Sequence, residues 1–178
     1  SPDGSDYFAL SLMPQQAIPL AESRDIVILF DTSASQSGVY RDKALAALRD
    51  LAATLGEKDR VALYSVDVKA VPMTSALVSP KSPEFAAALG KLQQRAPLGS
   101  TDMGEALNAA AEVLAAGNAP KRVVYIGDGQ NSAGPVGDDL NKTLDKLIDG
   151  RVSVSSYAVG PDSNNAFLAS VSNLTGGA

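Results

Sequence analysis

Five oxygen-bearing side chains stand where predicted strands end or a predicted helix begins: Asp31, Ser33, Ser35, Thr101 and Asp128. The first three follow the apolar run 25–30, the fourth precedes a helical segment, and the last follows the apolar run 122–126. Carboxylate and hydroxyl oxygens are the ligands that a hard cation such as Mg²⁺ takes, about six of them in a near-octahedral shell. The pattern predicts a site for Mg²⁺, or for Mn²⁺ or Ca²⁺ in its place, made of oxygen ligands only.

Histidine and cysteine are both absent from the 178 residues. Their absence removes the usual general base of serine and cysteine hydrolases and the common soft metal ligands, so we expect a protein that is not an enzyme. Two carboxylates leave the cation under-ligated, so an Asp or Glu from a partner protein would complete its shell with a strong contact. The sequence therefore predicts a metal-dependent protein-binding module.

The elements that must position these residues alternate between strands and helices. Apolar runs rich in β-branched residues predict strands at 25–30, 60–66, 69–73, 122–126 and 152–159. Helical spacing and capping residues predict helices at 42–55, 82–94, 102–116, 138–148 and 164–174. Pro72 favours a sheet edge for the third strand, and residues 7–13 could form an extra strand. This order predicts an α/β fold: a doubly wound, mostly parallel six-stranded sheet with helices on both faces and ligands at the C-terminal strand ends.

Composition favours one soluble, acidic domain. The net charge is -5 and the basic residues are scattered, which argues against a nucleic-acid partner. No apolar run approaches the roughly 18 to 20 residues that span a bilayer, so we expect no membrane insertion. The chain starts at Ser1 without a Met, and we expect it to be a piece of a longer protein, with residues 1–23 as an N-terminal flank and residues 24–178 as the domain.

The pattern Asp-x-Ser-x-Ser, followed later by a Thr and then an Asp, resembles the metal-ion-dependent adhesion site of the von Willebrand factor type A (vWA) family. All five positions match, and the resemblance extends over about residues 24–177. It implies a Rossmann-like vWA fold and an adhesion or interaction function. It also implies that Ser33, Ser35 and Thr101 contact the metal directly, that Asp31 and Asp128 act directly or through water, and that an acidic residue of the partner fills the open position.

The flank 6–12 is similar to the strand that enters this domain in inter-alpha-trypsin-inhibitor heavy-chain-like proteins. Those proteins are exported or lie at the cell surface, so the resemblance implies an extracellular or cell-envelope location. Three residues depart from the family pattern. Ala34 stands where the family usually has Gly, Gln36 where it has Met, and Gly127 where Thr or Ser is common.

Each loop also has a plainer interpretation. Residues 31–35 could form an Asx or Ser turn that caps the next helix, and Asp128 could be a turn residue between glycines. Thr101 and Asp102 are both ordinary N-cap residues, and for Asp102 we prefer the cap. The loop 129–137 could be a solvated connection or the rim of the site.

Two other functions remain open at this stage. The chain could be a structural vWA domain that packs against neighbouring domains of its parent protein. It could also be a metal-dependent phosphoryl-transfer enzyme with Asp31 as nucleophile. The enzyme fits less well, because Ser33 stands where haloacid-dehalogenase-like phosphatases have a second Asp, and no phosphate-binding Gly-rich loop is present.

Overall fold

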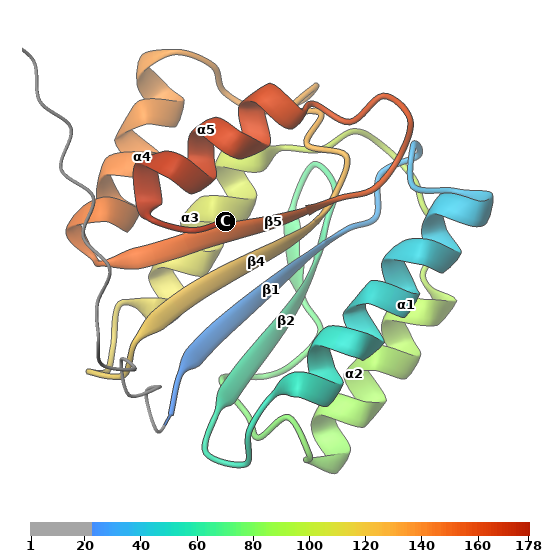
Figure 1. The fold of residues 1–178 in the computed structure, drawn as a ribbon. Coiled ribbons are helices and arrows are strands. Elements are labelled where there is room, and N and C mark those ends of the chain that lie inside the picture. Colours follow the sequence, from blue (N-terminus) through green and yellow to red (C-terminus); the bar gives the residue numbers. More distant parts are fainter. Residues whose placement is uncertain (1–22) are drawn as a thin grey trace, which may run out of the picture.

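A five-stranded sheet forms the centre of the computed structural model, which describes residues 23–178. The strand order is β3-β2-β1-β4-β5 (Figure 1). The strands are β1 (Asp25–Asp31), β2 (Arg60–Val66), β3 (Ala70–Pro72), β4 (Lys121–Gly127) and β5 (Val152–Ala158). All neighbours pair in parallel except β3, which runs antiparallel to β2 at the edge. The predicted fold class is confirmed, with five strands in the described residues instead of six. The possible extra strand at residues 7–13 lies outside them.

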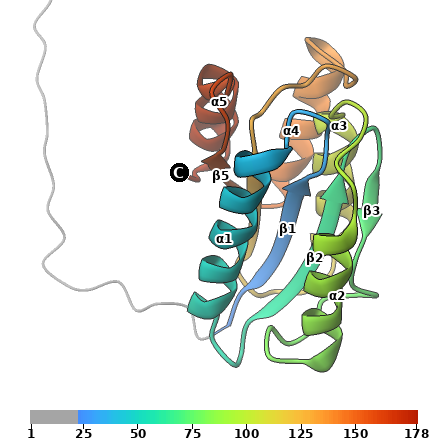
Figure 2. The same cartoon turned by 90° about the vertical axis from the view of Figure 1, so that its right-hand side faces the viewer.

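Helices cover both faces of this sheet (Figure 2). One apolar core joins the sheet to α3 (Met103–Leu114), α4 (Asp138–Asp149) and α5 (Asn165–Thr175). The other joins it to α1 (Gly38–Thr54) and α2 (Pro83–Gln94). Every residue of β1 is buried, because this strand lies in the middle of the sheet between the two cores. The continuous apolar run of β1 is thus the pattern of a strand covered on both faces.

Side-chain caps fix the starts of three helices, two of them as expected. Ser82 accepts a hydrogen bond from the Phe85 N–H before α2, and Asp102 accepts one from the Glu105 N–H, 2.8 Å away, before α3. Asn164 caps α5 in the same way. Only α1 differs clearly, since it begins at Gly38 and not at residue 42. Its first turn is largely exposed and carries no apolar repeat, so sequence periodicity misses it.

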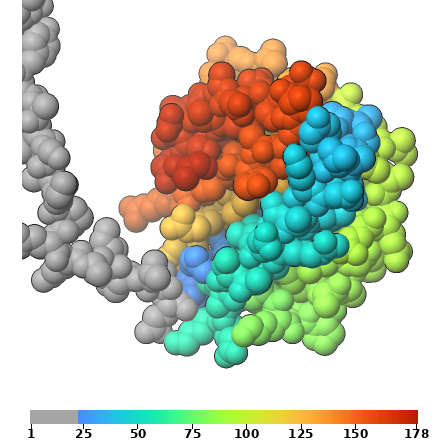
Figure 3. All heavy atoms as spheres, turned by 45° about the vertical axis from the view of Figure 1, so that its right-hand side comes forward, coloured from blue at the N-terminus to red at the C-terminus, as the bar shows by residue number. Residues whose placement is uncertain are grey.

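The β5 side of the molecule carries a groove. It has a volume of about 610 Å³ and lies between one side of α1 and the residues that end β5, including Tyr157 and Pro161. In Figure 3 the surface of α1 (cyan) lies beside that of β5 and α5 (orange to red). Among the described residues, no helix is long and apolar enough to cross a membrane.

Two ion pairs join neighbouring segments at the N-terminal ends of the strands. Arg60 donates to both carboxylate oxygens of Asp25, at 2.8 and 2.6 Å. Asp59, which is buried, accepts hydrogen bonds from the backbone and side chain of Arg24 and from the Gly56 N–H. The Arg24 guanidinium is the main cause that lowers the pKa of Asp59. Asp59 therefore ties the entry of β1 to the turn before β2.

We predict that Asp59→Ala lowers the free energy of unfolding by about 1 to 3 kcal/mol near neutral pH, because the Arg24 guanidinium and the N–H groups of Arg24 and Gly56 lose their acceptor. A depressed carboxyl pKa stabilises the folded state above the unfolded value of about 3.9, and this contribution disappears as pH falls through the folded pKa. Urea denaturation across this pH range should show that the difference in free energy of unfolding between wild type and variant becomes smaller in acid. The exposed Glu57→Ala is the control, expected to stay within about 0.5 kcal/mol; a gap that is constant with pH would contradict the charge argument.

Candidate metal centre

Three loops meet at the C-terminal end of the sheet. The loops that follow β1 and β4 are neighbours because these strands pair in parallel, with Phe30 opposite Ile126. The loop before α3 is held against the first one by two backbone hydrogen bonds. The Ala34 N–H donates to the Gly99 carbonyl at 3.0 Å, and the Leu98 N–H donates to the Thr32 carbonyl at 2.9 Å. Residues that are 70 positions apart in the sequence thus become neighbours.

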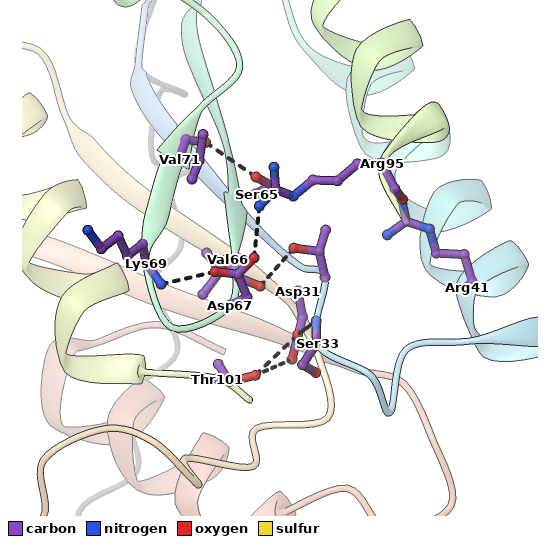
Figure 4. Close-up of polar contacts among 11 residues, drawn as sticks. Asp31, Ser33, Arg41, Ser65, Val66, Asp67, Lys69, Val71, Arg95 and Thr101 are labelled. Atoms are coloured by element: carbon purple, nitrogen blue, oxygen red, sulfur yellow. Dashed lines mark hydrogen bonds and ion pairs between the residues drawn. The ribbon is translucent and has the colours of Figure 1, made fainter. Parts of the chain in front are cut away.

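The predicted ligand residues contact one another across these loops. The Thr101 hydroxyl donates to the Asp31 carboxylate, 3.2 and 3.3 Å from its two oxygens, and Figure 4 shows the two side chains pointing toward each other. The hydroxyls of Ser33 and Ser35 are 2.9 Å apart. Asp128 is linked to Asp31 through Tyr125, whose hydroxyl donates to Asp31 and accepts from the N–H of Gly129, the residue after Asp128. The structure therefore brings all five predicted residues together.

Both carboxylates are removed from water. Asp31 is 0% exposed and Asp128 4%, whereas Ser35 is exposed. Burial is the largest effect on Asp31 and raises its pKa, while hydrogen bonds from Tyr125 and Ser33 act in the opposite direction. Within residues 23–178, no Lys or Arg forms an ion pair with either carboxylate. Two buried acids without a paired cationic side chain are what a divalent cation would neutralise.

Tyr125 is a residue of this site that sequence reasoning missed. Its hydroxyl donates to Asp31 Oδ2 at 2.6 Å and accepts from the Gly129 N–H at 3.2 Å. Burial, followed by the negative charge of Asp31, raises the pKa of Tyr125 well above its usual range, so the phenol stays protonated as a donor. One sign of this role was present in the sequence: Tyr125 places a polar hydroxyl within the apolar run 122–126.

The same tyrosine explains Gly127, one of the departures from the vWA pattern. A Cβ on Gly127 would lie 2.4 Å from Asp31 Cβ and 2.5 Å from the Tyr125 hydroxyl. Such distances are too short for any non-hydrogen atoms, so a Thr or Ser would displace the hydroxyl or the carboxylate. The Tyr125 hydroxyl occupies the space that a side chain at position 127, the last residue of β4, would take.

The turn interpretation is also correct, and it is compatible with a metal site. The Ser33 N–H donates to Asp31 Oδ1 at 2.8 Å, and the Gln130 N–H donates to Asp128 Oδ1 at 2.9 Å, so both acids form Asx turns. Each carboxylate retains further lone pairs after this bond. The predicted helix-capping role is wrong for the serines of this loop, since the N-cap of α1 is Ser37, which makes no side-chain capping bond.

The loop 129–137 forms part of the rim of the site and is more than a connection. Asn131 accepts from the Met103 N–H at 2.9 Å and donates to the Pro135 carbonyl at 2.7 Å. The Ala133 N–H donates to the Thr101 carbonyl at 3.1 Å. These bonds fasten the loop to the segment that carries Thr101.

Arg41 is a second residue that the sequence did not reveal. Its guanidinium lies over the Phe30 ring, 5.2 Å from the ring centre, and donates to the carbonyls of Leu92 and Arg95 at 2.6 and 2.9 Å. Arg95 in turn pairs with Asp67 at 2.8 Å, and both lie beside the site in Figure 4. Arg41 thus holds the end of α2, from which the Thr101 loop departs. An Arg in an amphipathic helix looks solvent-exposed in the sequence.

The donor set fits a hard cation. Residues 23–178 contain no group of three or more His, Cys, Asp or Glu side chains that could hold a metal, so two carboxylates must be supplemented by hydroxyls. Ser33, Ser35 and Thr101 provide them in the same place. A mixture of carboxylate and hydroxyl oxygens, with water in the remaining positions, is a shell typical of Mg²⁺.

We predict that Tyr125→Phe lowers the free energy of unfolding by about 1 to 3 kcal/mol in the presence of a chelator, because buried Asp31 loses a hydrogen-bond donor. Urea denaturation measures this change. The matched control is Tyr64→Phe, which removes the same hydroxyl from a half-buried position in β2 and should lower the free energy of unfolding less. A Tyr125→Phe variant as stable as wild type would mean that the phenol does not support the carboxylate.

Comparison with solved structures places this fold among known proteins. A von Willebrand factor type A protein from Catenulispora acidiphila has a TM-score of 0.76 at 22% identity, over 87% of this chain and 37% of that one. The chain thus spans 37% of the length of that protein. An aerotolerance-related membrane protein from Bacteroides fragilis has a TM-score of 0.64 at 18% identity, over 86% of this chain and 88% of that one. The PilB minor pilin from Streptococcus sanguinis has a TM-score of 0.61 at 14% identity, over 90% and 56%.

No curated protein sequence gave a significant match. Such low identities to solved structures establish the fold alone. The family is given by the sequence model that describes the von Willebrand factor type A domain, which matches residues 24–178. Domains of this family are mostly non-enzymatic interaction or structural modules. Because this sequence model matches residues 24–178 and the doubly wound sheet agrees with it, the chain belongs to the von Willebrand factor type A domain family.

Proposed function

We propose that this vWA domain binds protein partners through a divalent cation. The observation that carries the proposal is the pair of buried carboxylates, Asp31 and Asp128, which lie with three hydroxyls at the end of the sheet and form no ion pair with a cationic side chain of residues 23–178. A divalent cation, when bound, supplies a positive centre with an open position for a carboxylate of the partner. Mg²⁺ is the ion best suited to the site, with Mn²⁺ or Ca²⁺ as substitutes.

Two kinds of side chain would hold this cation. Ser33, Ser35 and Thr101 contribute neutral hydroxyl oxygens, and Asp31 and Asp128 contribute negative charge directly or through water. Tyr125 and the Asx turns fix the two carboxylates before a cation arrives, which reduces the ordering cost of binding. An Asp or Glu of the partner protein then completes the shell.

A location at the cell envelope or outside the cell accompanies this proposal. The similar structures include an aerotolerance-related membrane protein and a minor pilin, both bacterial. The support that these proteins give to the location comes only from their similar fold, because the sequence identities are low. Fractionation of the native cells with an antibody to this domain tests it, and recovery in the cytosol would argue against the proposal.

We expect Mg²⁺ to raise the melting temperature, because a ligand that binds only the folded state stabilises it by about 2.7 kcal/mol at a hundredfold excess over its dissociation constant. Differential scanning calorimetry with Mg²⁺ and with a chelator measures the shift, and titration calorimetry measures the heat of binding. Asp145→Ala, which removes an exposed acid on α4, should retain the full shift. Identical melting curves with metal and chelator, and no heat of binding, would contradict a metal site.

We also expect Asp128→Ala and Ser33→Ala to weaken partner binding while the fold is retained. Losing one side of a desolvated charge contact costs about 2 to 5 kcal/mol, so affinity should fall more than tenfold. A pull-down from the native source, repeated with a chelator, provides the partner, and its affinity is then measured in saturating Mg²⁺ with circular dichroism to check folding.

The controls for this pair are Asp145→Ala and Ser170→Ala, which remove the same groups from exposed positions on α4 and α5. Both should bind as wild type does. If the folded site variants also bind as wild type does, recognition uses another surface. A structural role, in which the domain packs against neighbouring domains of its parent protein, would then be the better explanation.

A further inference from the structure

The large apolar side chains that the described residues expose are unevenly distributed. Four of them lie on segments next to the three loops of the candidate metal centre: Val39 (61% exposed), Val68 (52%), Leu98 (68%) and Val136 (76%). Tyr157 lines the groove beside α1, and Ile148 and Leu174 lie on α4 and α5. We call the first four the apolar rim. They come from four different segments, which the fold gathers at one end of the sheet.

Two members of the apolar rim are anchored directly beside the ligand residues. Leu98 donates its backbone N–H to the carbonyl of Thr32, the residue that follows Asp31, at 2.9 Å. Val68 is in the β2–β3 turn next to Asp67, whose carbonyl accepts from the Asp102 N–H at 2.9 Å. These backbone bonds hold Leu98 and Val68 beside the segments that carry Asp31 and Thr101.

The other two members complete the rim. Val39 lies in the first turn of α1, four residues after the exposed Ser35. Val136 follows Pro135, which packs so closely on the start of α3 that a Cβ on Gly104 would lie 2.4 Å from the proline ring. Its loop is also bonded to Thr101 through Ala133. None of the four side chains has a role in either apolar core.

Attraction of an acidic partner to this surface would have to come from the cation, because the exposed acids Asp138 and Asp139 lie close to Val136. Asp67 and Arg95 neutralise each other through their ion pair, and Asp102 is engaged in capping α3. Exposed apolar side chains that cluster around a polar centre are typical of interaction sites. Apolar contacts around a charged contact also exclude water and strengthen it, as rim residues do at protein interfaces.

We propose that the apolar rim receives apolar side chains on both sides of the partner's acidic residue, so that the partner presents an exposed peptide segment with Asp or Glu among Val, Leu, Ile or Phe. This inference rests on the proposed function, since the acid between them would contact the cation. Because the four rim residues come from four different segments, a partner segment that crosses the site would contact more of them than one that ends on it.

A random heptapeptide phage library tests the inference on the intact domain. Phage are bound to immobilised protein in Mg²⁺ and eluted with a chelator, and the eluted sequences are compared with the input library. The expected result is enrichment of Asp or Glu with apolar residues within two positions on either side. Chelator-eluted acidic peptides whose neighbours are apolar only at library frequency would overturn the rim, while leaving metal-dependent binding intact. A library with no chelator-eluted sequence would contradict the proposed function itself, and the rim with it.

A matched pair of variants provides the second measurement, using the most enriched peptide as the probe. Leu98→Ser combined with Val136→Ser should lower peptide affinity by about tenfold or more, because two apolar contacts are lost. Mg²⁺ binding by calorimetry and the melting temperature should remain those of wild type. Leu174→Ser removes an apolar side chain that is 56% exposed on α5 and should leave affinity within about twofold. Equal affinities for the rim variant and the α5 variant would overturn the proposal.

Discussion

Burial of the Asp31 carboxylate at the end of the central strand is the constraint on which the rest of the site depends. A charge taken out of water is costly unless it is hydrogen-bonded or neutralised. Three donors from three segments meet that requirement: the Ser33 backbone, the Thr101 hydroxyl and the Tyr125 phenol. Because no single segment supplies all three, satisfying this carboxylate joins the loop after β1, the strand β4 and the loop before α3.

Other features of this end of the molecule follow from that convergence. Gly127 has no side chain because the phenol and the carboxylate fill its space. The Thr101 loop needs a fixed origin, which Arg41 provides by bonding the last carbonyls of α2 from within the protein. Asn131 fastens the neighbouring loop to the start of α3. The site is therefore supported by residues that would never contact a cation.

The proposed function assigns recognition to this arrangement. The part of the chain that the structure describes offers two acids, three hydroxyls and a protonated phenol around one centre. The apolar rim adds contact area without adding charge. A cation at the centre would give strength and orientation, whereas the rim would decide which acidic segments fit, so affinity and selectivity would come from different residues of the same surface.

The sequence alone determined the fold class, the central position of β1, the edge position of β3 and the N-caps of α2 and α3, because strand periodicity, proline chemistry and capping are local properties of the chain. It also predicted five residues of the candidate site. It could not identify Tyr125 or Arg41, since a tyrosine in an apolar strand and an arginine in a helix have many uses. Their roles depend on atoms from segments about 50 to 94 positions away in the sequence. Only the tertiary structure decided which side chains support Asp31, why Gly127 must be glycine, and that four exposed apolar residues share one end of the sheet. Each of these features depends on the distance between segments in the folded protein, which the order of residues in the chain does not specify.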